Sequence, residues 1–266
     1  MNTKTRLLRD EDPLPCGVER PESASPILFV SDHAGRAVPQ ALGTLGLDEV
    51  ELSRHIGHDI GIYGVTTKLA QTLGATYLFQ RYSRLVIDCN RKPRNQQSIP
   101  TVSDGTAIPG NLDLTEDETA AREDEIMRPY HTRIETELAG RAAKGRPTVL
   151  ISMHSYTEQM RSAPSHRPWE ICVMAARDWR LADALVQVLQ SETTLCVGVN
   201  EPYVVDMEMD YTVPTHAEGK NIPYVEIEIR QDLIADTSGQ QYWATLLSDI
   251  FPRAVAQSGI VPEYNQ

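Results

Sequence analysis

Histidine and acidic residues follow several apolar runs of this sequence, in an arrangement that suits a metal site. His33 follows the apolar run over residues 27–31, His154 follows the run over residues 149–153, and acidic residues such as Asp59 occur nearby. Zinc in hydrolases usually takes three nitrogen or oxygen ligands from the protein and keeps a fourth position for water. The metal lowers the pKa of that water to about 7, and a further carboxylate then acts as general base. The pattern therefore indicates hydrolysis at a zinc site.

Two arginines flank another apolar run and could bind a substrate carboxylate. Arg84 precedes the run over residues 85–89, and Asn90 and Arg91 follow it. A guanidinium can give a carboxylate two parallel hydrogen bonds, which favours Arg at such sites. Either arginine could instead be a surface charge.

Two glutamates on the last apolar run are candidates for the general base. Glu226 and Glu228 alternate with apolar residues, so both can lie on one face of a strand. One of them could instead be the solvent-facing partner of an arginine.

A single histidine after a strand more often forms a loop hydrogen bond than a metal bond, and this interpretation is favoured for His131 and His166. His33 and His154 differ because both follow predicted strands. Their common position leaves ligation and loop hydrogen bonding both open.

The elements that must position these residues alternate between apolar strands and amphipathic helices. This alternation predicts an α/β fold, with three layers (α/β/α) around a mixed, mostly parallel sheet. In such folds, sites gather at the carboxyl ends of strands. Strands are predicted at residues 26–31, 77–79, 85–89, 149–153, 171–175, 195–199 and 224–229, and helices at 47–73, 115–145, 178–192 and 238–257.

Several local signals complete this outline. Residues 115–118 fit a capping box that opens a helix, and Pro129 is expected to kink that helix. Residues 91–114 read as a long loop, of a length that is often functional. Residues 1–24 are expected to form a polar arm over the surface, followed by one domain over residues 25–266.

Composition limits the partners and the compartment. The 266 residues carry a net charge of −12, which disfavours nucleic acids and anionic membranes as partners but permits a small carboxylate that meets a local arginine cluster. No run is long enough to span a membrane, and the charged N-terminus has no signal-like apolar region. The four cysteines form no Cys-x-x-Cys pair, so reduced thiols are expected. We expect a cytoplasmic monomer or small homo-oligomer.

Five motifs resemble the N-formylglutamate amidohydrolase family, from about residue 26 to residue 250. Their order of His, acid, Asn-Arg, His and Glu is also similar to the wider zinc carboxypeptidase and aspartoacylase group. The motifs are Ser31-Asp32-His33-Ala34-Gly35, Gly57-His58-Asp59-Ile60-Gly61, the segment from Ser83 to Arg91, His154-Ser155-Tyr156-Thr157, and the segment from Glu226 to Asp232.

The resemblance implies a phosphorylase/hydrolase-like α/β/α fold with one catalytic Zn²⁺. His33 and His154 would be ligands, and Asp59 would be the acidic ligand. The group's short-spaced His-x-x-Glu pair is absent, because position 36 is Arg36.

The same resemblance implies roles for residues around the metal. Glu228 would be the catalytic carboxylate in preference to Glu226, and Arg84 would polarise the scissile carbonyl. Asn90 and Arg91 would bind the substrate carboxylate. Residues of two polar-aromatic stretches would also face the substrate, namely Arg161, Tyr211 and His216.

The expected activity is therefore cleavage of an N-formyl or other N-acyl amide from a small carboxylate-bearing substrate, such as N-formylglutamate. A carboxypeptidase-like exopeptidase and a non-catalytic binding protein on the same fold are the alternatives. A nucleotide enzyme is disfavoured, because no Walker or Gly-x-Gly-x-x-Gly loop follows the first strand.

Overall fold

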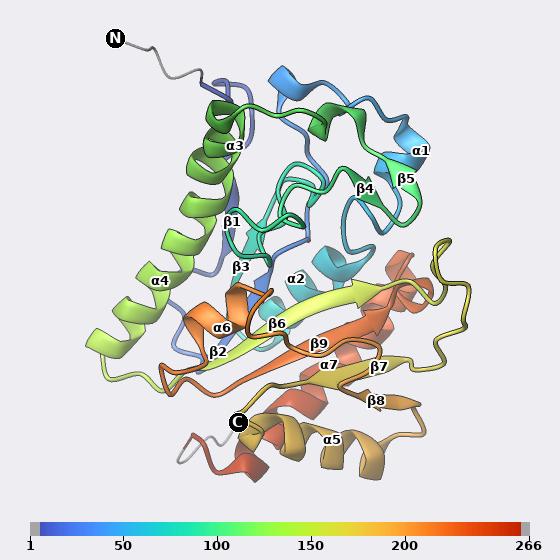
Figure 1. Cartoon of the computed structure of the whole chain (residues 1–266). Coiled ribbons are helices and arrows are strands. Elements are labelled where there is room, and N and C mark those ends of the chain that lie inside the picture. The colour runs from blue at the N-terminus through green and yellow to red at the C-terminus, as the bar shows by residue number, and fades with distance from the viewer. Residues whose placement is uncertain (1–5, 262–266) are drawn as a thin grey trace.

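A computed structural model describes residues 6–261, in which the chain winds around a seven-stranded sheet (Figure 1). The strand order in this sheet is β1-β3-β2-β6-β9-β7-β8. Its strands are β1 (Cys16–Glu19), β2 (Ile27–Ser31), β3 (Thr76–Gln80), β6 (Val149–Tyr156), β7 (Ile171–Met174), β8 (Val197–Val199) and β9 (Tyr224–Arg230). A separate hairpin consists of β4 (Val102–Ser103) and β5 (Thr106–Ala107).

The central strands run in one direction, so their carboxyl ends meet at one edge of the sheet. Strands β3, β2, β6 and β9 are parallel, whereas β1 and β7 are antiparallel to their neighbours β3 and β9. Val30 of β2 pairs with Ser152 of β6. Ser152 pairs with Glu226 of β9, and two residues further along His154 pairs with Glu228. This register places one histidine and one glutamate side by side.

Helices cover both faces of the sheet (Figure 1). Helix α7 packs against both α2 and α5 on one face, where the Phe29 and Phe251 ring centroids lie 6.0 Å apart. Helices α4 and α6 lie on the other face. The helices are α1 (Glu49–Leu52), α2 (Ile62–Thr72), α3 (Glu116–Arg122), α4 (Arg128–Ala143), α5 (Arg180–Glu192), α6 (Thr212–His216) and α7 (Thr237–Ser258).

The structure confirms the predicted α/β fold with a mixed, mostly parallel sheet between helices. It also confirms the capping box, since the Thr115 side chain accepts from the Glu118 amide and Glu118 bonds back to the Thr115 amide. A π-helical turn over Glu123–Met127 precedes α4, and Pro129 lies in the first turn of α4.

The predicted strand over residues 85–89 is wrong, because this apolar run is buried in turns. Side chains take the place of a neighbouring strand as hydrogen-bond donors. Asn111 Nδ2 donates to the Leu85 carbonyl at 2.8 Å, and Arg122 Nη1 donates to the Val86 carbonyl at 2.9 Å. Buried backbone groups need partners of some kind, and here two polar side chains satisfy them.

Three further boundaries differ from the predictions. His154 lies within β6 rather than after it. Part of the expected N-terminal arm is the edge strand β1, while residues 1–5 of that arm and 262–266 of the domain lie outside the described residues. The expected helix over 47–73 is divided into α1 and α2. A Cβ on Gly61, whose φ is +80°, would lie 2.0 Å from the Ile234 carbonyl oxygen, so the tight turn before α2 requires glycine here.

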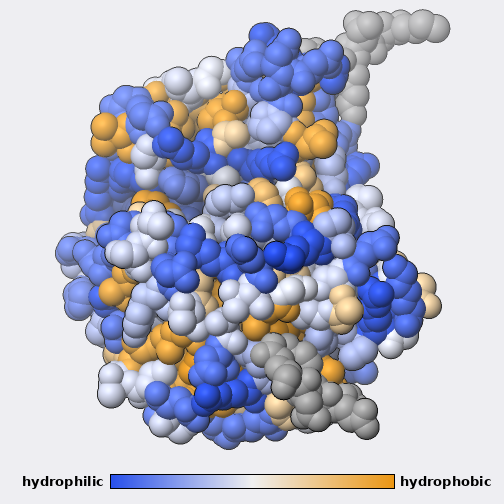
Figure 2. All heavy atoms as spheres, turned by 180° about the vertical axis from the view of Figure 1, so that it is seen from behind, coloured by the Kyte–Doolittle hydropathy of each residue, from blue (hydrophilic) through white to orange (hydrophobic). Residues whose placement is uncertain are grey.

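The surface seen from behind is mostly hydrophilic, with hydrophobic residues in small groups (Figure 2). Within residues 6–261, no helix combines the length and the apolar character that crossing a membrane would need.

Candidate metal centre

Two histidines and one aspartate converge at the carboxyl edge of the central strands. One ligand atom from each of His33, Asp59 and His154 lies within 4.8 Å of the others, and all three residues are buried. His33 lies two residues beyond β2, His154 lies on β6, and Asp59 lies in the turn before α2. The Asp59 amide donates to the His33 carbonyl at 2.9 Å, which fixes this turn against the end of β2. The three residues that the sequence predicted as ligands are therefore together.

Both imidazole rings turn their Nδ1 atom towards Asp59. Asp59 Oδ2 lies 3.5 Å from His33 Nδ1 and 2.9 Å from His154 Nδ1. On the far side, His33 Nε2 is 2.7 Å from Asp88 Oδ1. His154 Nε2 is 3.0 Å from the Ser152 hydroxyl and 3.5 Å from a carboxylate oxygen of Asp32. Metal-binding histidines commonly use their second nitrogen in this way, which fixes the tautomer and the ring orientation.

The donor set and the local charge both fit a divalent cation. His33 Nδ1 is buried without a hydrogen-bond partner among the described residues, so this nitrogen is free to bind a metal. Burial opposes protonation of both rings, but Asp88 and Asp59 still raise the pKa of His33, and Asp32 and Asp59 raise that of His154. The negative potential that favours a proton here also favours a metal ion. Two nitrogens and one carboxylate oxygen, with room for further ligands, are typical of a catalytic zinc site.

Glu228 and Glu226 lie beside this group on β9 and line the same cavity, whose volume is about 590 Å³. Both residues are buried, and each has one carboxylate oxygen, Oε2, without a hydrogen-bond partner among the described residues. Burial raises the pKa of Glu226 to about 7 and raises that of Glu228 as well. A carboxyl group with a raised pKa can both accept and donate a proton near neutral pH.

The predicted arginines line the cavity, and each is paired with a buried carboxylate. Arg84 Nε donates to Asp88 Oδ2 at 3.1 Å, and its Nη1 lies 3.7 Å from Asp59 Oδ1. Arg91 forms an ion pair with Asp210. Arg84, predicted to polarise the scissile carbonyl, and Arg91, predicted to bind the substrate carboxylate, therefore both lie at the cavity, but neither is an isolated cation.

Asn90 lines the cavity with its side chain engaged at the start of α6. Its Oδ1 accepts from the amides of Tyr211 at 3.3 Å and Thr212 at 3.1 Å. The side-chain Oδ1 of Asn90 therefore orders the loop before α6, and the side-chain NH₂ group is the part that can contact a substrate.

Three predicted substrate residues are not brought to this cavity. Arg161 is more than half exposed, and its Nη1 donates to Glu51 at 2.9 Å. Tyr211 and His216 pack around His131, whose Nδ1 lies 2.9 Å from His216 Nε2. His131 is held at its other nitrogen by the Cys89 carbonyl, so its predicted role as a hydrogen-bonding residue fits this geometry.

Sequence reasoning assigned no role to the carboxylates that position other site residues. Asp32 and Asp88 lie behind the two histidines, and Asp210 lies against Arg91. Asp32 directly precedes His33, and Asp88 follows Arg84 by four residues, so both lie inside the motifs quoted from the sequence. Their spacing from these residues could have identified them as hydrogen-bond partners of the site. Asp210 ends the acidic stretch 206–210, in which nothing distinguishes a buried carboxylate from an exposed one.

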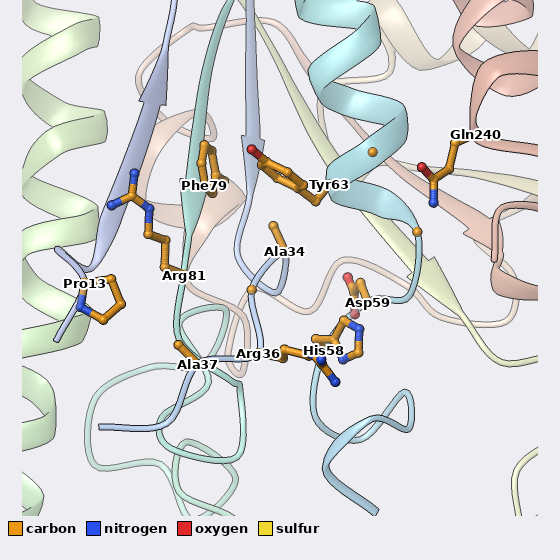
Figure 3. A pocket seen from close by; sticks show the side chains of 13 residues that line it. Pro13, Ala34, Arg36, Ala37, His58, Asp59, Tyr63, Phe79, Arg81 and Gln240 are labelled. Atoms are coloured by element: carbon orange, nitrogen blue, oxygen red, sulfur yellow. The ribbon is translucent and has the colours of Figure 1, made fainter. Parts of the chain in front are cut away.

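A second cavity of about 530 Å³ also borders Asp59, without the two histidines (Figure 3). His58, Arg36 and Asp59 lie close together in this view, and Tyr63 and Phe79 form a wall with ring centroids 4.9 Å apart. Because the two histidines and both glutamates face the larger cavity, the larger cavity is the candidate active site.

Comparison with known proteins shows which family the chain resembles over most of its length. The profile of the FGase family, described as N-formylglutamate amidohydrolase, matches residues 25–235. The crystal structure of a gene product of Agrobacterium tumefaciens is 35% identical, covers 95% of this chain and 99% of that one, and has a TM-score of 0.90. The N-formylglutamate amidohydrolase of Ralstonia eutropha JMP134 is 19% identical, covers 94% and 98% of the two chains, and has a TM-score of 0.68. No curated protein matches the chain.

Proposed function

The chain belongs to the N-formylglutamate amidohydrolase family, and from that premise we propose that it is a zinc-dependent amidohydrolase. Its substrate would be a small carboxylate-bearing molecule from which it cleaves an N-formyl or other N-acyl amide. The observation that carries this proposal is the buried group of His33, Asp59 and His154, which lies beside Glu228 in one cavity.

The residues around the group would divide the chemistry between them. A zinc ion bound by His33, Asp59 and His154 supplies Lewis-acid activation of water and of the amide carbonyl. Glu228, whose Oε2 has no hydrogen-bond partner among the described residues, would accept the proton of the attacking water and deliver it to the leaving nitrogen. Arg84 would donate to the carbonyl oxygen as negative charge develops there.

The substrate is held from the other side of the cavity. Arg91, which lines the cavity together with Asn90, would bind the substrate carboxylate through its guanidinium, and the Asn90 NH₂ group would donate to the same ligand. Pro202, Tyr203 and Val204 line the cavity as well and supply an apolar wall. Such a wall with a few convergent polar groups is usual in small-molecule sites.

Metal analysis together with an activity screen tests the proposal. We expect about one zinc per chain in the purified protein, and hydrolysis of N-formyl or N-acetyl amino acids that stops on chelation and returns with zinc. Hydrolysis of short peptides without hydrolysis of these amides would favour the exopeptidase. Absence of both stoichiometric metal and hydrolysis would favour a binding protein.

Asp88→Asn is expected to weaken zinc binding by about 10- to 100-fold, because the amide no longer polarises His33 through Nε2. The measurement is the zinc dissociation constant in competition with a chelator. Asp249→Asn makes the same chemical change at an exposed position on α7, where the carboxylate pairs with Arg253, and serves as the control. Equal zinc affinity in the two variants would contradict the positioning role of Asp88.

Arg91→Lys is expected to raise KM by about tenfold or more with little change in kcat. Lysine keeps the positive charge near Asp210 but cannot give a carboxylate two parallel hydrogen bonds. Steady-state kinetics on an N-formyl amino acid measure this split. Arg180→Lys on α5, where the arginine pairs with Asp178 at the surface, is the matched control. An unchanged KM in Arg91→Lys would remove Arg91 from substrate binding.

A further inference from the structure

A chain of hydrogen bonds runs from the first histidine of the metal centre to the start of α6. Asp88 Oδ1 lies 2.7 Å from His33 Nε2 and accepts from the Asn90 amide at 2.9 Å. The Asn90 side chain continues the chain, because its Oδ1 accepts from the Thr212 amide at 3.1 Å. Thr212 is the first residue of α6 and is fully buried. Its backbone is therefore tied to the carboxylate behind His33.

The Thr212 side chain extends this chain to the second histidine. Its hydroxyl donates to Asp32 Oδ1 at 2.8 Å, and the other oxygen of the same carboxylate, Oδ2, lies 3.5 Å from His154 Nε2. Asp32 is 1% exposed, and its Oδ2 has no hydrogen-bond partner among the described residues. A buried carboxylate depends on the donors that reach it, and these donors set its orientation. The Thr212 hydroxyl therefore holds Asp32 with Oδ2 towards His154.

The chain joins segments that are distant in the sequence. Thr212 is separated from Asp32 by 180 residues and from Asn90 by 122 residues. Because Thr212 contacts one of these segments through its side chain and the other through its backbone, removal of its hydroxyl would open the chain at one point and leave the backbone contact in place.

Resting on the proposed zinc-dependent function, we propose that Thr212 is a positioning residue of the metal centre. Its hydroxyl fixes Asp32 and with it the orientation of the His154 ring. Its amide joins this support to that of His33, so that one chain of hydrogen bonds orients both histidines. Thr212 is not among the residues that line the cavity, so it acts on the metal site through these residues and not by contact with the substrate.

The orientation of the two rings determines how well they bind a cation. Nδ1 of His33 and Nδ1 of His154 both face Asp59, so Nε2 is the nitrogen that carries the proton when Nδ1 binds a metal. The acceptor opposite the second nitrogen fixes the tautomer and the ring, and its loss typically costs about 10–100-fold in metal affinity. Members of one hydrogen-bond network also support one another, so the loss of one member weakens the contribution of the others.

Thr212→Val removes the hydroxyl and keeps the shape of the side chain. We expect zinc binding to weaken by about tenfold, measured in competition with a chelator. The visible absorption bands of Co²⁺ bound in place of zinc should also change, because they depend on the geometry of the ligands. Thr212→Ala, which also removes the hydroxyl and needs no extra space, should give the same two results and replaces the valine variant if that variant does not fold.

Thr212→Ser is the rescue variant, since it keeps the donor and removes only the methyl group. Its zinc affinity and its Co²⁺ spectrum should match those of the unmodified protein. If Thr212→Ser instead binds zinc as weakly as Thr212→Val, the methyl packing and not the hydrogen bond supports the site, which would overturn the proposed role.

Thr76→Val is the matched control for lost stability. Thr76 is equally buried, and its hydroxyl also forms hydrogen bonds, to the Arg20 carbonyl at 2.8 Å and with Arg141 Nη2 at 3.0 Å. It lies at the start of β3, away from the carboxyl edge of the sheet. Zinc affinity should stay at that of the unmodified protein. An equal loss of zinc affinity in Thr76→Val and Thr212→Val would show a general effect of destabilisation and would refute a specific role of Thr212.

The combination of Thr212→Val with Asp88→Asn tests whether one chain supports both histidines. In a single chain, the combined loss of zinc affinity should be smaller than the product of the two separate losses. A combined loss equal to that product would show that the two histidines are held independently, which contradicts the joint support.

The same metal-binding measurements separate this inference from the proposed function. If the unmodified protein binds zinc and Co²⁺ and Thr212→Val behaves identically in both readouts, the positioning role is wrong and the function stands. If Thr212→Val shows the expected changes but the zinc-loaded unmodified protein hydrolyses no N-acyl amino acid, the amidohydrolase function is wrong and the positioning role stands. An unmodified protein that binds neither metal would reject both.

Discussion

Glu228→Gln is expected to lower kcat by about 10²–10⁴-fold, the usual contribution of general acid–base catalysis, while zinc content stays at that of the parent. Glutamine keeps the size of the side chain and its place beside His154 on the β6–β9 ladder, but it cannot accept the proton of the attacking water. Because the lost interaction belongs to the transition state, KM should change little. Steady-state kinetics and metal analysis of the same preparation measure both effects.

Glu226→Gln is the informative comparison, since Glu226 lies two residues away on the same face of β9 and is equally buried. It should lose far less kcat than Glu228→Gln. If Glu226→Gln proves to be the inactive, zinc-loaded variant, the general base is Glu226. If Glu228→Gln loses its zinc, Glu228 is a metal ligand and Asp59 no longer needs to be one.

His33→Ala is expected to lose stoichiometric zinc and to reduce hydrolysis by about 10³-fold or more, because the metal contributes several kcal/mol of transition-state stabilisation. The substitution removes one of two nitrogen ligands and leaves Asp88 without the ring that it positions. Metal analysis after dialysis, and activity with and without added zinc, measure the loss.

The control for this substitution is His166→Ala, which removes an exposed imidazole from the loop after β6. Zinc content and activity should match those of the parent. Retention of one zinc per chain by His33→Ala would place the metal elsewhere and would refute the proposed ligand set.

The candidate metal centre could be predicted from the sequence because most of its residues lie where α/β folds usually form their sites. His33 and Glu228 are placed by the parallel strands themselves, whose carboxyl ends form the usual site of α/β proteins. The apolar runs that mark β2, β6 and β9 are unambiguous in the sequence. Asp59 comes from a turn, and the resemblance to a family, rather than its spacing, identified it.

The rest of the site depends on contacts between residues that are distant in the sequence, and a local sequence pattern does not reveal such contacts. Residues 85–89 have the composition of a strand, but the donors that hold their carbonyls lie on Asn111 and Arg122, 26 and 36 residues further along the chain. Arg161 and His216 were predicted from a polar-aromatic composition that suits a substrate wall and a packed loop equally well. Only the tertiary structure separates these two uses.

Arg122 is a single buried side chain on which the position of the segment around residues 84–91 depends. It is 1% exposed, sits at the end of α3, and holds both the Val86 carbonyl and the Asn111 side chain. The segment it secures carries Arg84 and Arg91, whereas the candidate metal ligands His33, Asp59 and His154 belong to other segments. Substitutions at Arg122 could therefore shift the segment that carries Arg84 and Arg91 and leave the candidate metal ligands unchanged. In a lineage of such enzymes, substrate range could diverge while the hydrolytic chemistry stays constant.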